Sequence, residues 1–244
     1  MDLSTAQLLL SCIDLTSLND TDNSEIIQKL CDKAITPHGH VAAVCVYPPF
    51  VRQAAQQLKN TPVKIATVVN FPSGNQAIET VVAAIHQAKV DGAQEIDAVL
   101  PYQDFLNQDQ AGTRAFIEAC KTTCGENILL KIILETGALK KPELIAEACR
   151  TAILAGADFV KTSTGKIAEG ATIEAATIML LTIQGLRPKV KRPLGLKVSG
   201  GIREPEQAQQ YYELACRILG EKNITPATFR IGASQLVDKL LANL

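Results

Sequence analysis

The feature that most constrains this chain is a repeated alternation of short runs rich in Val and Ile with longer segments of helical period. A short apolar run bounded by turn residues predicts a buried strand, and apolar residues at i, i+3 and i+4 predict an amphipathic helix. Strands that alternate with helices are typical of βα units around a parallel sheet. The alternation therefore predicts an α/β fold.

The number of candidate strands narrows the fold further. They are the runs 11–16, 41–47, 63–71, 95–101, 128–136, 158–164, 194–200 and 228–234. Helices are predicted between them, most clearly over 75–90, 142–154 and 204–219, and Gly92 and Gly156 are expected to follow helices in a left-handed conformation. Eight such units close a (β/α)8 barrel, which takes about 250 residues, and no low-complexity linker divides the chain. We predict a (β/α)8 TIM barrel with a single domain over residues 1–244.

Composition excludes several kinds of partner. Lys+Arg number 24 and Asp+Glu 25, so the formal net charge of -1 supplies no global field for nucleic acid or an anionic membrane. The N-terminus has no basic segment of the secretory type, and no apolar run approaches the ~18 residues of a membrane span. The 7 cysteines lack CxxC spacing and no ligand set forms around the 3 histidines. We expect reduced thiols, a cytoplasmic location, no metal site, no nucleic acid and no membrane.

Polar side chains interrupt the apolar strands near their C-terminal ends, where a barrel presents its active site. They are Asp14, Thr16, Cys45, Asn70, Asp97, Lys131, Glu135, Lys161, Thr162, Ser163, Thr164, Lys197, Ser199 and Ser234. Three of these residues are lysines in strands predicted to be buried. Burial of an ammonium group costs several kcal/mol unless a partner or a lowered pKa relieves it.

The three lysines allow two interpretations. In the first, each forms an ion pair that fills the barrel: Lys131 with Glu135, Lys161 with Asp97, and Lys197 with Asp14. In the second, one amine is a nucleophile, although a lysine with a pKa of about 10.4 is neutral at pH 7 in fewer than about one molecule in a thousand. A second ammonium group at about 4 Å can lower that pKa by up to roughly 3 units. Lys161 and Lys197 lie on consecutive predicted strands, so we expect them to be close enough for this effect.

A phosphate site is predicted independently. Barrel enzymes often hold phosphate with the loops after the seventh and eighth strands, where backbone N–H groups converge at a helix N-terminus. Gly200 and Gly201 follow the predicted seventh strand, and Gly232 and Ser234 lie at the end of the eighth. Glycines let a backbone approach a ligand closely. The alternative is that the paired glycines only make a turn and Ser234 only caps a helix.

The segment DFVKTSTGK at 158–166 resembles the Schiff-base strand of the deoxyribose-phosphate aldolases. The resemblance continues through the segments 14–16, 44–48, 69–72, 95–101, 131–136, 197–203 and 230–234, and so covers nearly the whole chain. It implies a cofactor-free class I aldolase, a lyase of deoxyribose catabolism. Such an enzyme cleaves 2-deoxy-D-ribose 5-phosphate to acetaldehyde and D-glyceraldehyde 3-phosphate.

Taken residue by residue, the resemblance implies that Lys161 forms the Schiff base, that Lys197 is the second lysine, and that Asp97 belongs to the proton relay. It implies that the small phosphorylated sugar is bound by Thr16, Asn19, Cys45, Thr164, Gly165, Lys166, Gly200, Gly201, Gly232 and Ser234. Cys45 is expected to be either a wall of the pocket or a reagent. The resemblance also implies a homodimer.

The chain departs from the pattern of some members of this family. Val198 and Ser199 replace a Pro-Ala pair, and Gln235 replaces a second serine, so phosphate affinity is expected to differ. The sequence ends at Leu244 without a tail that ends in tyrosine, so proton transfer from such a tail is expected to be absent or replaced. Three alternatives stay open: a Schiff-base aldolase for another aldehyde pair, an isomerase that uses Asp97 as base without a covalent adduct, and a sugar-phosphate-binding protein without catalysis.

Overall fold

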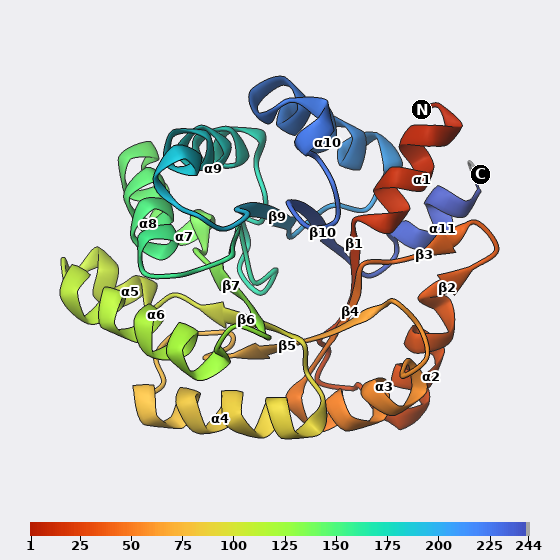
Figure 1. Ribbon diagram of the computed structural model, residues 1–244, viewed down its shortest axis with the longest axis horizontal. Coiled ribbons are helices and arrows are strands. Elements are labelled where there is room, and N and C mark those ends of the chain that lie inside the picture. The colour runs from red at the N-terminus through yellow and green to blue at the C-terminus, as the bar shows by residue number, and fades with distance from the viewer. Residues whose placement is uncertain (243–244) are drawn as a thin grey trace.

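Eight parallel strands close into a barrel in the computed structural model, which describes residues 1–242 (Figure 1). The strands are β1 Ile13–Ser17, β4 Ala43–Val46, β5 Lys64–Val69, β6 Glu95–Val99, β7 Leu129–Ile133, β8 Phe159–Lys161, β9 Gly195–Ser199 and β10 Phe229–Ala233. Each pairs with the next along the chain, and β10 closes the ring against β1. The predicted TIM barrel is confirmed, and every strand overlaps its predicted run.

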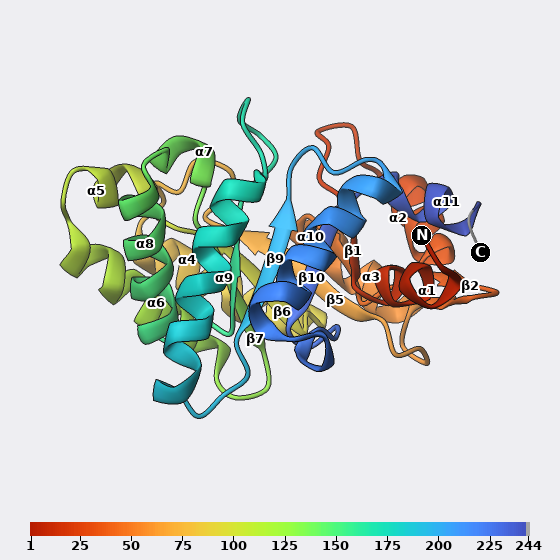
Figure 2. The ribbon, with the colours of Figure 1, turned by 90° about the horizontal axis from the view of Figure 1, so that it is seen from above.

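Helices surround the barrel and separate consecutive strands (Figures 1 and 2). They are α1 Leu3–Ser11, α2 Ser24–Lys33, α3 Val51–Gln57, α4 Ile78–Asp91, α5 Tyr102–Leu106, α6 Gln110–Cys124, α7 Thr136–Leu139, α8 Pro142–Leu154, α9 Ile173–Leu186, α10 Pro205–Leu219 and α11 Leu236–Leu241. Three short 3-10 helices are η1 Pro48–Phe50, η2 Arg187–Lys189 and η3 Glu221–Asn223. The three helices predicted most clearly correspond to α4, α8 and α10, and α8 matches at both ends.

Two local features modify the predicted boundaries. Helix α4 begins later than predicted because Asn70 holds a turn before it: Gly74 N donates to Asn70 O (2.9 Å) and Gln76 N donates to Asn70 Oδ1 (2.8 Å). A small hairpin of β2 Ile35–Thr36 and β3 Gly39–His40 lies between α2 and β4, outside the predicted strand runs. Each of its strands has 2 residues, too few to show the alternation of apolar and polar residues that predicts a strand.

The left-handed glycines predicted after two helices are confirmed. Gly92 has φ 104° at the end of α4, and Gly156 has φ 114° just after α8. This backbone region strains any residue with a Cβ atom, which explains why glycine stands at both helix ends.

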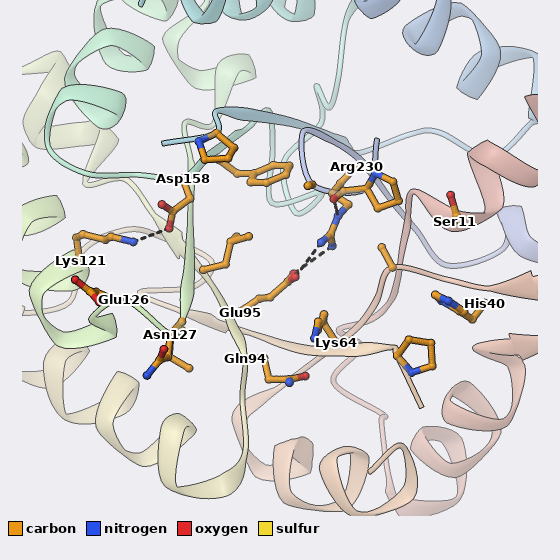
Figure 3. A pocket seen from close by; sticks show the side chains of 18 residues that line it. Ser11, His40, Lys64, Gln94, Glu95, Lys121, Glu126, Asn127, Asp158 and Arg230 are labelled. Atoms are coloured by element: carbon orange, nitrogen blue, oxygen red, sulfur yellow. Dashed lines mark hydrogen bonds and ion pairs between the residues drawn. The ribbon is translucent and has the colours of Figure 1, made fainter. Parts of the chain in front are cut away.

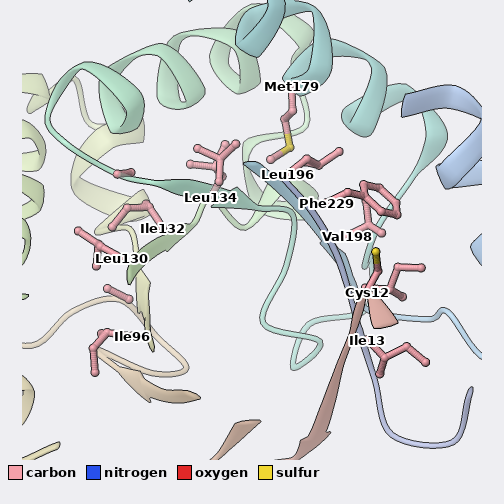
Figure 4. Close-up of a cluster of buried hydrophobic side chains, with 14 of the residues drawn as sticks. Cys12, Ile13, Ile96, Leu130, Ile132, Leu134, Met179, Leu196, Val198 and Phe229 are labelled. Atoms are coloured by element: carbon pink, nitrogen blue, oxygen red, sulfur yellow. The ribbon is translucent and has the colours of Figure 1, made fainter. Parts of the chain in front are cut away.

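An apolar layer fills the space between the barrel and its helices. Figure 4 shows part of it, with Met179 of α9 facing Leu134, which follows β7, and Leu196 of β9. Successive strand residues point to opposite faces, so Leu130 and Ile132 of β7 join this layer while Lys131 points into the barrel. The barrel interior is therefore where the polar strand residues meet.

Candidate active site

Asp97, on β6, lies at the centre of the barrel interior and contacts all three lysines. Its Oδ1 accepts a hydrogen bond from Lys131 Nζ at 2.8 Å, and its Oδ2 accepts from Lys161 Nζ at 2.9 Å and Lys197 Nζ at 2.7 Å. The strand register explains this arrangement. Asp97 is paired with Lys131 across β6 and β7, and Lys161 with Lys197 across β8 and β9, so each pair points to one side.

Further carboxylates extend this cluster. Lys197 Nζ lies 2.6 Å from Asp14 Oδ2, and Lys131 Nζ lies 2.6 Å from Glu95 Oε2. Arg230 joins both carboxylates, with Nη1 2.6 Å from Asp14 Oδ1 and Nη2 2.9 Å from Glu95 Oε1. Each lysine is thus held in an ion network, as the first interpretation of the lysines predicted.

One of the predicted ion pairs is wrong. Glu135 does not pair with Lys131 but turns to Thr164, accepting a hydrogen bond from Thr164 Oγ1 at 2.5 Å and from its backbone N–H at 3.3 Å. The reason is the backbone: Glu135 follows the end of β7 with φ 56°, so its side chain leaves the alternation of the strand. This fully buried carboxylate anchors the loop that follows Lys161.

The lysines differ in the direction in which their pKa is shifted. Burial lowers the pKa of Lys161, and the Lys197 ammonium adds to this shift while the Asp97 carboxylate opposes it. Burial acts on Lys197 and Lys131 too, but their carboxylate partners, chiefly Asp14 and Asp97 for Lys197, outweigh it and raise their pKa. Repulsion by Lys197, the cause expected from the sequence, contributes less to the lowered pKa of Lys161 than burial does. Lys161 is the amine of the trio closest to a nucleophilic state.

A cavity of about 480 Å³ opens beside Lys161 at the C-terminal ends of the strands. It brings together nine of the ten predicted substrate-binding residues: Thr16, Asn19, Thr164, Gly165, Lys166, Gly200, Gly201, Gly232 and Ser234. Cys45 is fully buried and does not belong to this lining. Among the described residues that line the cavity, Lys161 is the one member of the lysine trio, while Asp97 and Lys197 lie buried behind it.

The glycines of the predicted phosphate loops are required by close packing at Gly200 and Gly232 and by a left-handed backbone at Gly200 and Gly201. A Cβ on Gly200 would lie 2.8 Å from Gly170 Cα, and both Gly200 (φ 93°) and Gly201 (φ 86°) are left-handed. A Cβ on Gly232 would lie 3.1 Å from Lys197 Cε, so this glycine leaves room for the second lysine. The alternative role of Ser234 as a helix cap is not found, because Gln235 occupies the N-cap of α11.

Sequence reasoning missed three charged residues. Arg203 lines the cavity, and its signal was a basic residue two positions beyond the paired glycines. Glu95 lies two residues before Asp97 on one strand, and the period of two already placed both on one face. Arg230 lies on β10, where a charge in an apolar strand was a signal of the same kind as the lysines.

Residues 1–242 offer little for other kinds of site. No group of three or more His, Cys, Asp or Glu there is arranged to hold a metal ion. All seven cysteines are free, and six of them are buried. None of the helices in that part of the chain is long and apolar enough to cross a membrane. The question of a tail beyond Leu244 lies outside the described residues.

Comparison with known proteins places this barrel in a family. The family model of the DeoC/LacD family aldolases matches residues 8–234. Because this match covers most of the sequence, the chain belongs to the DeoC/LacD family of aldolases, which are lyases.

Solved structures with the same fold include three relatives. A protein assigned as a deoxyribose-phosphate aldolase from Coccidioides immitis is 29% identical, with a TM-score of 0.83, over 98% of this chain and 87% of that one. An apo structure of a protein with the same assignment from Toxoplasma gondii ME49 is 26% identical, with a TM-score of 0.86, over 98% and 95%. An aldolase called QR15 is 27% identical, with a TM-score of 0.80, over 96% of each chain.

Proposed function

We propose that this chain is a class I aldolase that cleaves 2-deoxy-D-ribose 5-phosphate to acetaldehyde and D-glyceraldehyde 3-phosphate through a Schiff base on Lys161. The observation that carries the proposal is the position of Lys161. Its amine borders the cavity, its pKa is lowered by burial, and its Nζ lies 2.9 Å from Asp97 Oδ2. An amine that is neutral and exposed to a substrate pocket is the nucleophile that Schiff-base chemistry needs.

The first steps make the covalent intermediate. Neutral Lys161 adds to the aldehyde carbon of the open-chain sugar, and the carbinolamine takes up one proton and loses water to give an iminium ion. This cation withdraws electrons from the bond between the second and third carbons. The bond breaks as the hydroxyl on the third carbon loses its proton, D-glyceraldehyde 3-phosphate leaves, and an enamine remains on Lys161. The enamine takes a proton at carbon, and water then hydrolyses the iminium to release acetaldehyde.

Asp97 and Lys197 are suited to move the proton in these steps. The Asp97 carboxylate is buried, which by itself would raise its pKa, but Lys131, Lys161 and Lys197 hold that pKa well below its usual range. Asp97 Oδ2 is shared by the amines of Lys161 and Lys197. Once Lys161 is an iminium it has a single N–H left to donate, and the shared Asp97 oxygen can accept a proton through a water molecule.

The phosphate is proposed to bind across the cavity from Lys161. Backbone N–H groups near Gly165, Gly200, Gly201 and Gly232 would approach its oxygens, and the exposed side chains of Lys166 and Arg203 supply positive charge. Gln235 lies in the same lining, where some relatives carry serine. Its amide can donate a hydrogen bond as a hydroxyl does, but from a longer side chain.

The decisive experiment is covalent trapping. Purified enzyme is incubated with 2-deoxyribose 5-phosphate and sodium borohydride, and the adduct is located by peptide mass spectrometry. We expect a reduced adduct on the peptide that contains Lys161. Lys161→Leu should abolish it, whereas Lys59→Leu, which removes an exposed lysine of the loop after α3, should keep it. An active, folded enzyme without any adduct would refute the Schiff-base mechanism in favour of an isomerase.

Turnover assays identify the substrate independently of the trapping experiment, which tests the mechanism. An adduct on Lys161 with poor turnover of 2-deoxyribose 5-phosphate would indicate an aldolase for another aldehyde pair, which the breadth of the family allows. Aldol addition between panels of aldehydes then identifies that pair. A homodimer, and a cytoplasmic location that keeps the free thiols reduced, are proposed along with this activity.

A further inference from the structure

Seven charged side chains form one buried cluster through the barrel interior. It contains the carboxylates of Asp14, Glu95 and Asp97 and the cations Lys131, Lys161, Lys197 and Arg230. Each of these residues is at most 5% exposed. Charges so removed from water depend on one another for their stability, because solvent cannot compensate an imbalance.

Glu95 and Arg230 form the end of the cluster that is far from the candidate active site. They line a second cavity, of about 520 Å³, at the N-terminal ends of the strands. Figure 3 shows the Arg230 guanidinium reaching Glu95 there, and it also lies 5.7 Å from the ring of Phe159. Neither residue lines the cavity beside Lys161, so an effect on the reaction must pass through the cluster.

Charges in this cluster balance only when Lys161 is neutral. Three carboxylates face three cations other than Lys161, namely Lys131, Lys197 and Arg230. A protonated Lys161 adds a fourth cation, and the buried cluster then carries one net positive charge. A neutral Lys161 amine leaves the cluster without net charge.

Other groups near Lys161 do not alter this count. Cys45 faces the cluster from β4, but burial raises the pKa of its thiol, so it stays uncharged. Glu135 is buried nearby and accepts from Thr164; no ion pair in residues 1–242 joins it to the lysines, and because it is the same in every variant it affects all their Lys161 midpoints alike. Asp14 and Asp97 have a lowered pKa, and Lys131, Lys197 and Arg230 a raised one. Among the members whose pKa is shifted, Lys161 is the one shifted towards its uncharged form.

We infer that Arg230 and Glu95 are positioning residues that set the charge state of Lys161 from the opposite end of the barrel, by fixing the charge balance of the buried cluster. The inference deepens the proposed function, on which it rests for the catalytic role of Lys161. Arg230→Met removes a cation and should favour protonated Lys161. Glu95→Gln removes an anion and should favour the neutral amine.

The test is a titration of Lys161 that needs no aldolase activity. Formaldehyde condenses with neutral amines, and cyanoborohydride reduces the resulting iminium to a methylamine. The initial rate of methylation of the Lys161 peptide, measured by mass spectrometry across pH, gives the midpoint of its titration. Exposed Lys59 is the internal reference, and its midpoint should stay the same in every variant.

We expect opposite shifts of about one pH unit, the scale of a unit charge at roughly 10 Å and an effective dielectric of about 20. The midpoint should rise in Arg230→Met and fall in Glu95→Gln. Arg230→Lys keeps the charge while losing the two-pronged geometry, so its midpoint should stay near the wild-type value. The double variant Arg230→Met/Glu95→Gln removes one charge of each sign and should return toward wild type.

Opposite shifts separate charge balance from a merely structural role, which would move both variants in the same direction. Midpoints that move together, or that do not move, would overturn the inference. If Arg230→Met fails to fold, as judged by circular dichroism, Glu95→Gln and the double variant still decide it. Failure of borohydride trapping with the sugar phosphate would instead overturn the proposed function and leave this titration interpretable.

Discussion

The barrel interior is divided into two unlike sides. On β4 and β5 the inward residues are small and apolar: Ala43, Cys45, Ala66 and Val68, with Leu18 packed beside them. On β1 and β6 to β10 the inward residues include all seven charges of the buried cluster. Every pair of neighbouring strands uses the same parallel pairing, so the difference lies in the side chains and not in the backbone.

This difference shows how the apolar side of the barrel affects the pKa values on the charged side. Ala43, Cys45, Ala66 and Val68 offer no counter-ion to the buried cluster, so its charges are neutralised by one another. Burial is accordingly the first cause of the lowered pKa of Lys161. The pairing of parallel strands fixes the spacing of the amines. Burial in the barrel lowers the pKa of Lys161 and so favours its reactive, neutral form.

The largest effect is expected from Asp97→Asn, which removes the carboxylate shared by the three lysines. Loss of a group that moves a proton in the transition state lowers kcat by about 10²–10⁴-fold. The neighbouring ammonium groups lose their common partner, so urea unfolding should show a loss of stability as well. An Asp97→Asn enzyme with wild-type kcat would place the proton transfer on another residue.

Asp14→Asn should reduce the free energy of unfolding by an amount that depends on pH, which a substitution on the apolar side should not do. Burial opposes ionisation of Asp14, but Lys197, Arg230 and Lys131 lower its pKa in the folded state below the unfolded value of about 3.9. Its contribution to stability is therefore present above that value and is lost as pH falls towards the folded pKa. We expect Asp14→Asn to cost about 3–5 kcal/mol at pH 7, because it leaves buried cations unpaired.

The same destabilisation should shrink below about pH 4, where this carboxylate takes up a proton in the unfolded wild-type protein while it is still ionised in the folded one. Urea unfolding of both proteins at pH 7, 5 and 3 measures the difference between them. A difference that is the same at every pH would show that Asp14 acts through packing and hydrogen bonding instead of charge.

Val68→Ala probes the apolar side. Removing two buried methyl groups costs about 2 kcal/mol by area and cavity terms. Since no charge is involved, this loss should be independent of pH, in contrast to that of Asp14→Asn. Val68 is paired with Asp97 across β5 and β6, but it carries no charge and does not line the cavity beside Lys161, so kcat should stay within about twofold. A large fall in kcat would show that the apolar side positions Lys161 directly.

The sequence predicted the barrel well because strand and helix periods repeat along the chain. It also predicted that Asp97, Lys161 and Lys197 converge, since a parallel barrel brings such positions to one interior. It could not predict where Glu135 points, because the left-handed backbone that turns it to Thr164 is set by tertiary structure. Arg230 and Glu95 were predictable in principle from the period of two on their strands. They were not predicted because candidates were sought only near the C-terminal ends of the strands, and these two residues lie near the N-terminal ends.

The smallest effect is expected from Lys166→Met, at the mouth of the cavity beside Lys161, where the charged side of the barrel meets solvent. Lys166 lines the cavity but is itself exposed, and its Nζ lies 2.5 Å from the backbone oxygen of Leu18. Solvent screens such a charge, so Lys166→Met should raise KM for 2-deoxyribose 5-phosphate by only about tenfold, or about 1.4 kcal/mol, with kcat nearly unchanged. Unphosphorylated 2-deoxyribose should show no change in KM, because it lacks the group that Lys166 binds. Equal effects on both sugars would mean that Lys166 shapes the loop after β8 and does not contact phosphate, and the charged side of the barrel would then end at the buried cluster.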